Sequence, residues 1–222
     1  MDHSKQASVV FDKLAELYQS KFMDVSAYAE GFDEFLGSLV KKNAGILEIA
    51  CGPGNITKYL LDKNPDLKIL GIDLAPNMVG LARSNCPAAD FEVMDCRNIH
   101  SIERTFDGFV VGFCLPYLDK KEAARLLKDI SLLLDPAGIL YLSTIEGDHK
   151  DSDYKKGSTG DEVFMHYYTA EDIRHFLSEA LLQIISEKTV KAANNPHMDT
   201  DLVVLAKKIA ADSQIKSSDA VE

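Results

Sequence analysis

Hydrophobic residues follow two different spacings along the chain. Between residues 8 and 40 they recur every three or four positions, which predicts two amphipathic helices. From residue 45 the pattern changes to short apolar runs separated by segments of helical spacing. These runs cover residues 45–50, 67–72, 91–94, 106–113 and 138–143. Strands that alternate with helices in this way predict β-α-β crossovers and a parallel sheet with helices on both faces.

Several helix boundaries carry a local signal. Helices are expected to begin near Asn55, Pro76 and Asp119. Asp119 and Thr169 each stand three residues before a carboxylate, so both can open a helix through a capping box. Residues 135–138, Asp-Pro-Ala-Gly, are expected to end the helix that Asp119 opens and to turn the chain into the next strand.

Two further apolar runs, 181–190 and 201–207, are predicted to form the last strands. An Asn-Asn-Pro turn at residues 194–196 joins them through a connection too short for a crossover, so they are expected to pair antiparallel. The expected fold is therefore α/β, with a doubly wound, mostly parallel seven-stranded sheet, a C-terminal antiparallel strand and an N-terminal helical cap.

Composition is that of an ordinary globular protein with a negative charge. Of the 222 residues, 46% are hydrophobic and 27% are charged, so a full core can be buried. The 24 Lys and Arg against 35 Asp and Glu leave a net charge of −11, the wrong sign for binding many phosphates. Nucleic acids and membranes are therefore not expected as partners. The chain shows no signal segment and no run of about 18 apolar residues, which predicts a cytoplasmic location.

The cysteines give no sign of a metal centre or of a disulfide framework. The four of them, Cys51, Cys86, Cys96 and Cys114, include no C-x-x-C pair and join no Cys/His cluster with the ligand spacing of zinc. Free thiols, as in a reducing compartment, and no bound metal are therefore expected.

The segment most informative about chemistry is residues 46–55, Ile-Leu-Glu-Ile-Ala-Cys-Gly-Pro-Gly-Asn. An apolar strand ends there in a small-residue turn that opens a helix, where backbone can approach a ligand closely. About 20 residues further on, a second strand ends in Asp73, whose carboxylate can accept both ribose hydroxyls of an adenosine. Asp73 is also suited to cap the helix near Pro76. The two features together predict a site for a nucleotide-like ligand.

The next two strands end at the same edge of the predicted sheet. The third runs into Asp95 and Cys96, and the fourth ends at Phe113 and Cys114. In an open α/β sheet the ligand crevice lies outside the carboxyl ends of the strands, so all four ends should converge on one pocket.

With these landmarks, residues 45–144, and more loosely the chain to Lys208, resemble a class I S-adenosylmethionine-dependent methyltransferase of the small-molecule type. The leucine-rich stretch at 132–140 is similar to the family's approach to its fifth strand, and Ala50 stands where the first glycine of the loop is most common. The resemblance implies S-adenosylmethionine as cofactor. It also implies a helical cap over the cofactor at residues 1–42, a Rossmann-like domain at 43–208 and a frayed tail at 209–222.

The resemblance further implies a set of cofactor-binding residues. The loop would surround the methionine part of the cofactor, Asp73 would bind the ribose, and Asp95 would lie at the adenine edge. The full set is Tyr18, Glu48, Ala50, Cys51, Gly52, Gly54, Asp73, Leu74, Met78, Asp95, Cys96 and Phe113.

Candidate catalytic residues are fewer. His149 and His166 follow the fifth strand, where a loop would overhang the pocket, and Tyr18 lies in an N-terminal helix. The long connection at 146–168 has a polar half, expected to be mobile, and an aromatic half. If the aromatic half is extended, Phe164, His166 and Tyr168 share one face. One face of this half is expected to line the acceptor pocket opposite Tyr18 or Tyr28; the alternative is an ordinary strand packed on the sheet.

Two other functions remain open. A nicotinamide-dependent oxidoreductase is the alternative enzyme, although Thr57 stands where the third glycine of a G-x-G-x-x-G fingerprint belongs. A non-catalytic cofactor-binding protein on the same fold is the other. The stretch 114–117, Cys-Leu-Pro-Tyr, resembles the Asn/Asp-Pro-Pro-Tyr element of amino-directed DNA and RNA methyltransferases. The first position of that element is Asn or Asp, and a thiol in its place cannot accept hydrogen bonds from an exocyclic amine as these residues do. The methyl acceptor, the atom methylated and the choice between monomer and homodimer are not specified.

Overall fold

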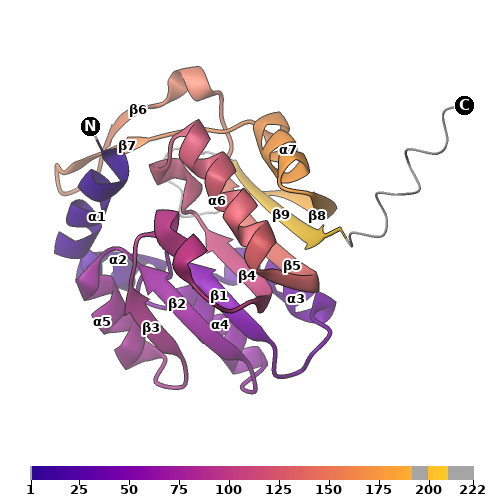
Figure 1. Ribbon diagram of the computed structural model, residues 1–222. Coiled ribbons are helices and arrows are strands. Elements are labelled where there is room, and N and C mark those ends of the chain that lie inside the picture. The colour runs from indigo at the N-terminus through magenta and orange to yellow at the C-terminus, as the bar shows by residue number, and fades with distance from the viewer. Residues whose placement is uncertain (1, 192–199, 210–222) are drawn as a thin grey trace, which may run out of the picture.

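A seven-stranded sheet runs through the middle of the molecule (Figure 1). The protein is described by a computed structural model covering residues 2–191 and 200–209. The strands lie in the order β3-β2-β1-β4-β5-β9-β8, and β9 is antiparallel to both neighbours while the pairs from β3 to β5 are parallel. Their bounds are β1 Gly45–Ile49, β2 Lys68–Asp73, β3 Asp90–Val93, β4 Phe106–Gly112, β5 Leu134–Ile145, β8 Leu182–Val190 and β9 Asp201–Lys208. The predicted α/β fold is confirmed.

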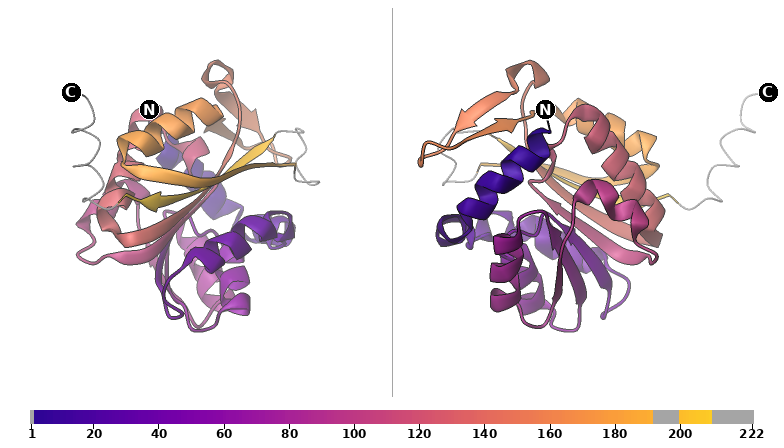
Figure 2. Two further views of the ribbon diagram at one scale, coloured as in Figure 1. Left: turned by 90° about the vertical axis from the view of Figure 1, so that its right-hand side faces the viewer. Right: turned by 60° about the vertical axis from the view of Figure 1, so that its left-hand side comes forward.

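Helices cover both faces of the sheet, because alternate side chains of each strand point to opposite sides (Figure 2). In β1, Ile46 packs into the hydrophobic core on one face of the sheet, and Leu47 packs into the core on the opposite face. The first set is α3 Ala29–Ser38, α4 Asn55–Lys63 and α5 Pro76–Asn85; the second is the short η2 Cys96–Ser101, α6 Lys120–Leu133 and α7 Ala170–Glu179.

The predicted helix starts are confirmed, and two have the expected caps. The Asp119 carboxylate accepts hydrogen bonds from the Lys121 and Glu122 N–H groups, and the Thr169 hydroxyl accepts one from Asp172. Both capping boxes are complete. α4 and α5 begin at Asn55 and Pro76.

The N-terminal cap differs from the prediction of two helices. It consists of α1 His3–Lys13, α2 Ala15–Phe22, the short η1 Ser26–Tyr28 and α3, because the chain breaks at Leu14. The buried positions of α1 and α2 are Ala7 and Ala15, whereas Val9 is 68% exposed. The fully buried positions of these two helices are therefore small side chains.

The start of β5 also differs from the prediction. The residues 135–138 do not separate helix from strand, because Leu134 already pairs with Phe106. The register shifts between Phe106 and Gly108, and Ala137 takes a positive φ of 63° there. The stretch is thus a bulge within β5 rather than a turn before it.

The long connection after β5 folds into a second, two-stranded sheet. Its strands are β6 Asp153–Lys156 and β7 Glu162–Met165, and the short η4 His149–Asp151 precedes them. The polar half predicted to be mobile therefore supplies β6, which pairs with the aromatic half. α1 lies beside this hairpin (Figures 1 and 2), and Lys13 of α1 forms an ion pair with Asp161 at 2.8 Å.

Some predictions cannot be followed in the structure. The turn at 194–196 and the tail from residue 210 lie outside the described residues, and the domain boundaries remain predictions. Among the residues that are described, no helix has the length and apolar character needed to cross a membrane.

Candidate functional site

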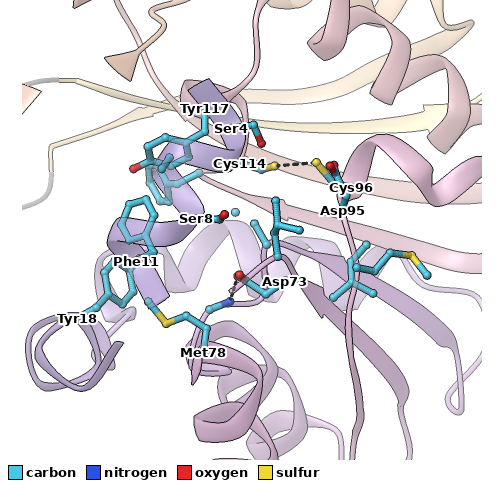
Figure 3. A pocket seen from close by; sticks show the side chains of 18 residues that line it. Ser4, Ser8, Phe11, Tyr18, Asp73, Met78, Asp95, Cys96, Cys114 and Tyr117 are labelled. Atoms are coloured by element: carbon cyan, nitrogen blue, oxygen red, sulfur yellow. Dashed lines mark hydrogen bonds between the residues drawn. The ribbon is translucent and has the colours of Figure 1, made fainter. Parts of the chain in front are cut away.

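A pocket of about 120 Å³ opens where the parallel strands end (Figure 3). Its floor is formed by the loop 50–54 after β1 and by the ends of β2 and β4, and its lid is formed by α1 and α2. The lining residues are Ser4, Ala7, Ser8, Phe11, Tyr18, Ala50, Gly52, Ile72, Asp73, Leu74, Met78, Met94, Asp95, Cys96, Gly112, Phe113, Cys114 and Tyr117. The converging strand ends that the sequence predicts are thus brought together.

The loop in the floor has an unusual backbone. Ala50, Gly52 and Gly54 all have positive φ values, of 55°, 53° and 82°. At Gly54 a side chain would also meet α5, because an added Cβ would lie 3.3 Å from the Ala82 Cα. The sequence places glycine at two of these three positions, which lets the loop turn sharply beside the pocket.

Asp73 holds the loop in place from the end of β2. Its carboxylate accepts hydrogen bonds from the Gly52 and Ala75 N–H groups, each at 2.9 Å. Burial raises the pKa of Asp73 above its usual value, against the effect of these hydrogen bonds. The predicted N-cap role at α5 is wrong, because Ala75 is the N-cap residue of that helix and the bond from its N–H to Asp73 lies in the turn before it. The Asp73 carboxylate also lines the pocket.

Aromatic rings form the wall on the lid side. Phe11 lies edge-on to Tyr117 with ring centres 5.0 Å apart, and edge-on to Tyr18 at 5.8 Å. Burial, followed by the negative charge of Asp73, raises the pKa of Tyr18 to about 12. Tyr18 therefore keeps its proton at neutral pH and can donate a hydrogen bond, but it is poorly suited to act as a base.

The opposite wall contains Asp95 and two thiols. The Asp95 carboxylate bonds to the guanidinium of Arg97, with an Oδ2–Nη2 distance of 2.6 Å. Burial acts to raise the pKa of Asp95, but the hydrogen bonds from Arg97 outweigh it and hold the pKa below its usual value. The Cys96 and Cys114 sulfur atoms lie 3.8 Å apart.

Three predicted cofactor residues lie behind the floor rather than in its surface. Glu48 is 1% exposed and accepts a hydrogen bond from the Thr57 hydroxyl through Oε2, while its Oε1 is buried without a partner. Burial raises the pKa of Glu48 to about 8, so the group is mostly protonated at neutral pH. Cys51 packs in a small core under α5, and Gly54 is the N-cap of α4. These residues shape the loop and do not line the pocket.

The predicted histidines gather outside the pocket. The His149 and His166 rings stack with centres 5.9 Å apart, and His3 of α1 lies 5.8 Å from His166. His166 is 8% exposed, and its Nδ1 is buried without a hydrogen-bond partner. Burial, then the neighbouring His149 and His3, lowers the pKa of His166. The backbone N–H of His166 donates to the Pro116 carbonyl at 2.8 Å, which places the cluster next to Tyr117.

Two other aromatic residues, Tyr168 of the connection and Tyr28 of η1, have structural positions. Tyr168 is fully buried in the main core, and its hydroxyl donates to the Leu118 carbonyl. Tyr28 donates to the Asp201 carboxylate at 2.6 Å, and its ring lies 5.3 Å from that of Phe113. For Tyr168 the structure fits the alternative of a segment packed on the sheet.

A helical cap over the pocket was predicted, but none of the residues that α1 contributes to it was named. Ser4, Ala7, Ser8 and Phe11 lie on one helical face and line the pocket (Figure 3). Their spacing of three and four residues is visible in the sequence, but small polar side chains give no hydrophobic signal.

Comparison with known proteins identifies relatives of the central part of the chain. Residues 46–138 match a family model described as a methyltransferase domain. The chain is 32% identical over 127 residues to the putative methyltransferase 235L of Invertebrate iridescent virus 6, covering 54% of this chain and 47% of that protein. It is 25% identical over 141 residues to the demethylmenaquinone methyltransferase of Thermotoga maritima, covering 62% of this chain and 61% of that one. The matched region thus spans about half of these relatives' length.

A solved structure extends the likeness to nearly the whole chain. It is the 1,6-didemethyltoxoflavin-N1-methyltransferase of Burkholderia thailandensis, with 1,6-didemethyltoxoflavin and S-adenosylhomocysteine bound. The TM-score is 0.74, and the alignment covers 95% of this chain and 91% of that one at 19% identity. At this identity the likeness shows a common fold.

Proposed function

Because residues 46–138 carry a methyltransferase domain on the class I fold, we propose that the protein transfers a methyl group from S-adenosylmethionine to a small molecule. The observation that carries the proposal is the position of Asp73. Its partly buried carboxylate accepts the hydrogen bond of the Gly52 N–H and lines the same pocket as the loop after β1. Loop and carboxylate are thus one unit suited to an adenosine ligand.

The residues of the pocket fit this cofactor. Gly52 presents no side chain to the wall, so backbone is accessible to the methionine part. Leu74 and Met78 supply apolar surface for the adenosine, and Asp73 supplies acceptors for its ribose. We propose Asp95 and Cys96 for the adenine edge and Ala50, Tyr18 and Phe113 for the region around the sulfur.

The chemistry needs alignment more than it needs acid or base catalysis. When bound, the cofactor supplies a methyl group on a positively charged sulfur, which an acceptor atom displaces in line. The pocket lining contains no histidine, and its two carboxylates are already engaged by N–H groups and by Arg97. Such a site favours a nucleophile whose lone pair is free without the help of a base. An oxygen acceptor would have to reach His166 or His149 beyond Tyr117.

The relatives support a small acceptor. The Burkholderia enzyme is named for 1,6-didemethyltoxoflavin and the Thermotoga enzyme for demethylmenaquinone. The aromatic wall of Phe11, Tyr18 and Tyr117 suits a flat molecule of this kind, since rings stack favourably on aromatic side chains.

The nicotinamide alternative has less support. Thr57, at the position of the third glycine, is fully buried and bonded to Glu48, so a dinucleotide pyrophosphate has no glycine there to approach. A non-catalytic cofactor-binding role is distinguished from the proposal by activity alone.

Calorimetry with S-adenosylhomocysteine and with NAD tests the proposal first. We expect binding of the former only, and a gain of about 2.7 kcal/mol in stability at 100 times its dissociation constant. Radiolabelled methyl transfer to a panel of aromatic amines, thiols and phenols then tests catalysis, with Asp73→Ala as the control. Equal affinity for NAD would overturn the proposed cofactor. Binding with no transfer to any acceptor class would favour the non-catalytic role.

A further inference from the structure

We propose that Arg97 is a positioning residue that couples closure of the lid to the adenine side of the pocket. One guanidinium joins the first turn of α1 to the carboxylate at the end of β3. The identity of the ligand in this inference rests on the proposed function, whereas the coupling of α1 to Asp95 rests on contacts within the chain.

The contacts of Arg97 reach three separate elements. Its Nη1 and Nη2 donate to the two Asp2 carboxylate oxygens at 3.1 and 3.0 Å. Its Nε and Nη2 donate to Asp95, at 2.9 Å to Oδ1 and 2.6 Å to Oδ2. Nη1 also donates to Glu122 of α6 at 2.8 Å. The side chains are 19% exposed for Arg97 and 12% for Asp95, so the central pair is well shielded from water.

Asp2 is well placed to hold α1 down. It is the N-cap of that helix, and its Oδ1 accepts a hydrogen bond from the Lys5 N–H at 3.1 Å. The same carboxylate therefore caps the helix and binds Arg97. The next residues of α1, beginning with Ser4, form the roof of the pocket (Figure 3).

The size of the pocket indicates that α1 has to move. A volume of about 120 Å³ is well below the roughly 300–1,000 Å³ of sites that bury a small organic ligand. A ligand can enter or leave only if α1 shifts, and this shift breaks the Asp2–Arg97 contact.

Two other polar contacts of α1 do not reach a residue of the pocket wall. Lys13 pairs with Asp161 of the hairpin, and Asp12 accepts a hydrogen bond from the Asn77 N–H at 2.7 Å. Neither Asp161 nor Asn77 lines the pocket. Arg97 differs because its partner Asp95 lines the pocket. The position of the Asp95 carboxylate therefore depends on the guanidinium that also holds the lid.

The substitution Asp2→Asn isolates the coupling. Asn is as good an N-cap as Asp, so α1 keeps its cap while the charge that attracts Arg97 is removed. Arg97→Gln is the second variant; it leaves Asp95 without its cation, so its effects combine the loss of the lid contact with a change at the wall. The matched control is Lys120→Gln, which removes a comparable ion pair with Asp172 at 2.7 Å, away from the pocket.

Hydrogen exchange of residues 2–13 in the ligand-free protein gives the first readout. We expect Asp2→Asn and Arg97→Gln to speed exchange in α1 by about 3- to 10-fold, and Lys120→Gln to leave it unchanged. Unchanged exchange in Asp2→Asn would overturn the proposal, even if no ligand bound to any variant.

Dissociation of S-adenosylhomocysteine, followed by stopped flow, gives the second readout. We expect Asp2→Asn to raise both the dissociation rate and the association rate by about 3- to 10-fold, because entry and exit both require α1 to shift. In a double-mutant cycle, Asp2→Asn should add almost nothing when Arg97 is already Gln, because Asp2 acts through Arg97. Independent, additive effects would show that Asp2 acts by another route. Absence of binding in the wild-type protein would count against the proposed function, and the exchange experiment would still decide the coupling.

Discussion

The floor of the pocket and the lid above it are held in place by different kinds of contact. In the floor, β1 is paired on both sides by β2 and β4, and the partly buried Asp73 carboxylate fixes the loop through the Gly52 N–H. The lid is attached by a small apolar cluster of Ala15 with Met78 of α5, and by polar contacts between partly exposed side chains, such as Lys13 with Asp161. Ion pairs of this kind contribute about 0–1 kcal/mol each. The floor is therefore expected to stay fixed while the lid opens at lower cost, as ligand entry requires.

The largest effect is expected behind the floor, at Glu48. Its pKa is raised to about 8 in the folded protein against a usual value of 4.5, so the folded state binds this proton more tightly than the unfolded state. The stabilisation is complete below pH 4.5 and is lost as the pH rises toward about 8, by up to about 1.4 kcal/mol per pH unit. Glu48→Gln should flatten this decline. Urea unfolding at pH 5 and pH 8.5 measures how much unfolding free energy is lost between these pH values. An equal loss in Glu48→Gln and in the wild type would contradict the assignment.

Gly54→Val should break the floor by sterics. The position has a φ of 82°, and the new side chain would press on α5 at Ala82. We expect a loss of about 2–3 kcal/mol in the free energy of unfolding. Gly80→Ala in the same helix is the control, because nothing lies within 4 Å of its added Cβ and helix propensity favours Ala. A Gly54→Val protein as stable as wild type would mean that the loop can relax.

Asp73→Ala should weaken binding of S-adenosylhomocysteine by about 10- to 100-fold, measured by calorimetry. The reason is the loss of hydrogen bonds to a charged group, worth about 1.5–3 kcal/mol. Asp95→Ala should weaken binding less, since water can replace an adenine-edge contact. The order of the two effects is the sharper test. A larger loss of affinity in Asp95→Ala than in Asp73→Ala would mean that the wall, and not the floor, contributes most to binding.

The smallest effect on cofactor affinity is expected on the lid side, at His166. The ring lies outside the pocket, so His166→Ala should change affinity by no more than about threefold, or roughly 0.7 kcal/mol. Turnover of an acceptor should change if this cluster borders the acceptor site. Tyr168→Ala does not test the same role, because Tyr168 is fully buried in the core and its loss should destabilise the protein. Full activity of His166→Ala would assign the cluster a structural role.

The same contrast explains what could be predicted from the sequence. The strands, the loop and Asp73 were predictable because long-range pairing in a parallel sheet leaves apolar runs with small or acidic residues at their ends. Residues 46–138, which carry most of these landmarks, match the model of a methyltransferase domain.

The lid was not predictable in the same way. The break at Leu14 and the β6–β7 hairpin depend on tertiary contacts such as Lys13 with Asp161, which no local pattern encodes. Ser4 and Ser8 face the pocket, and small polar side chains add nothing to the hydrophobic periodicity of α1. Arg97 carries no sequence signal for its contact with Asp2, since the two are brought together only by the fold.

A crystal structure with S-adenosylhomocysteine bound tests the central claim most directly. The account predicts that both ribose hydroxyls lie within about 2.7–3.2 Å of the Asp73 carboxylate oxygens, with the adenosine against Leu74 and Met78 beneath α1. A ligand bound elsewhere, or one whose ribose does not contact Asp73, would contradict it.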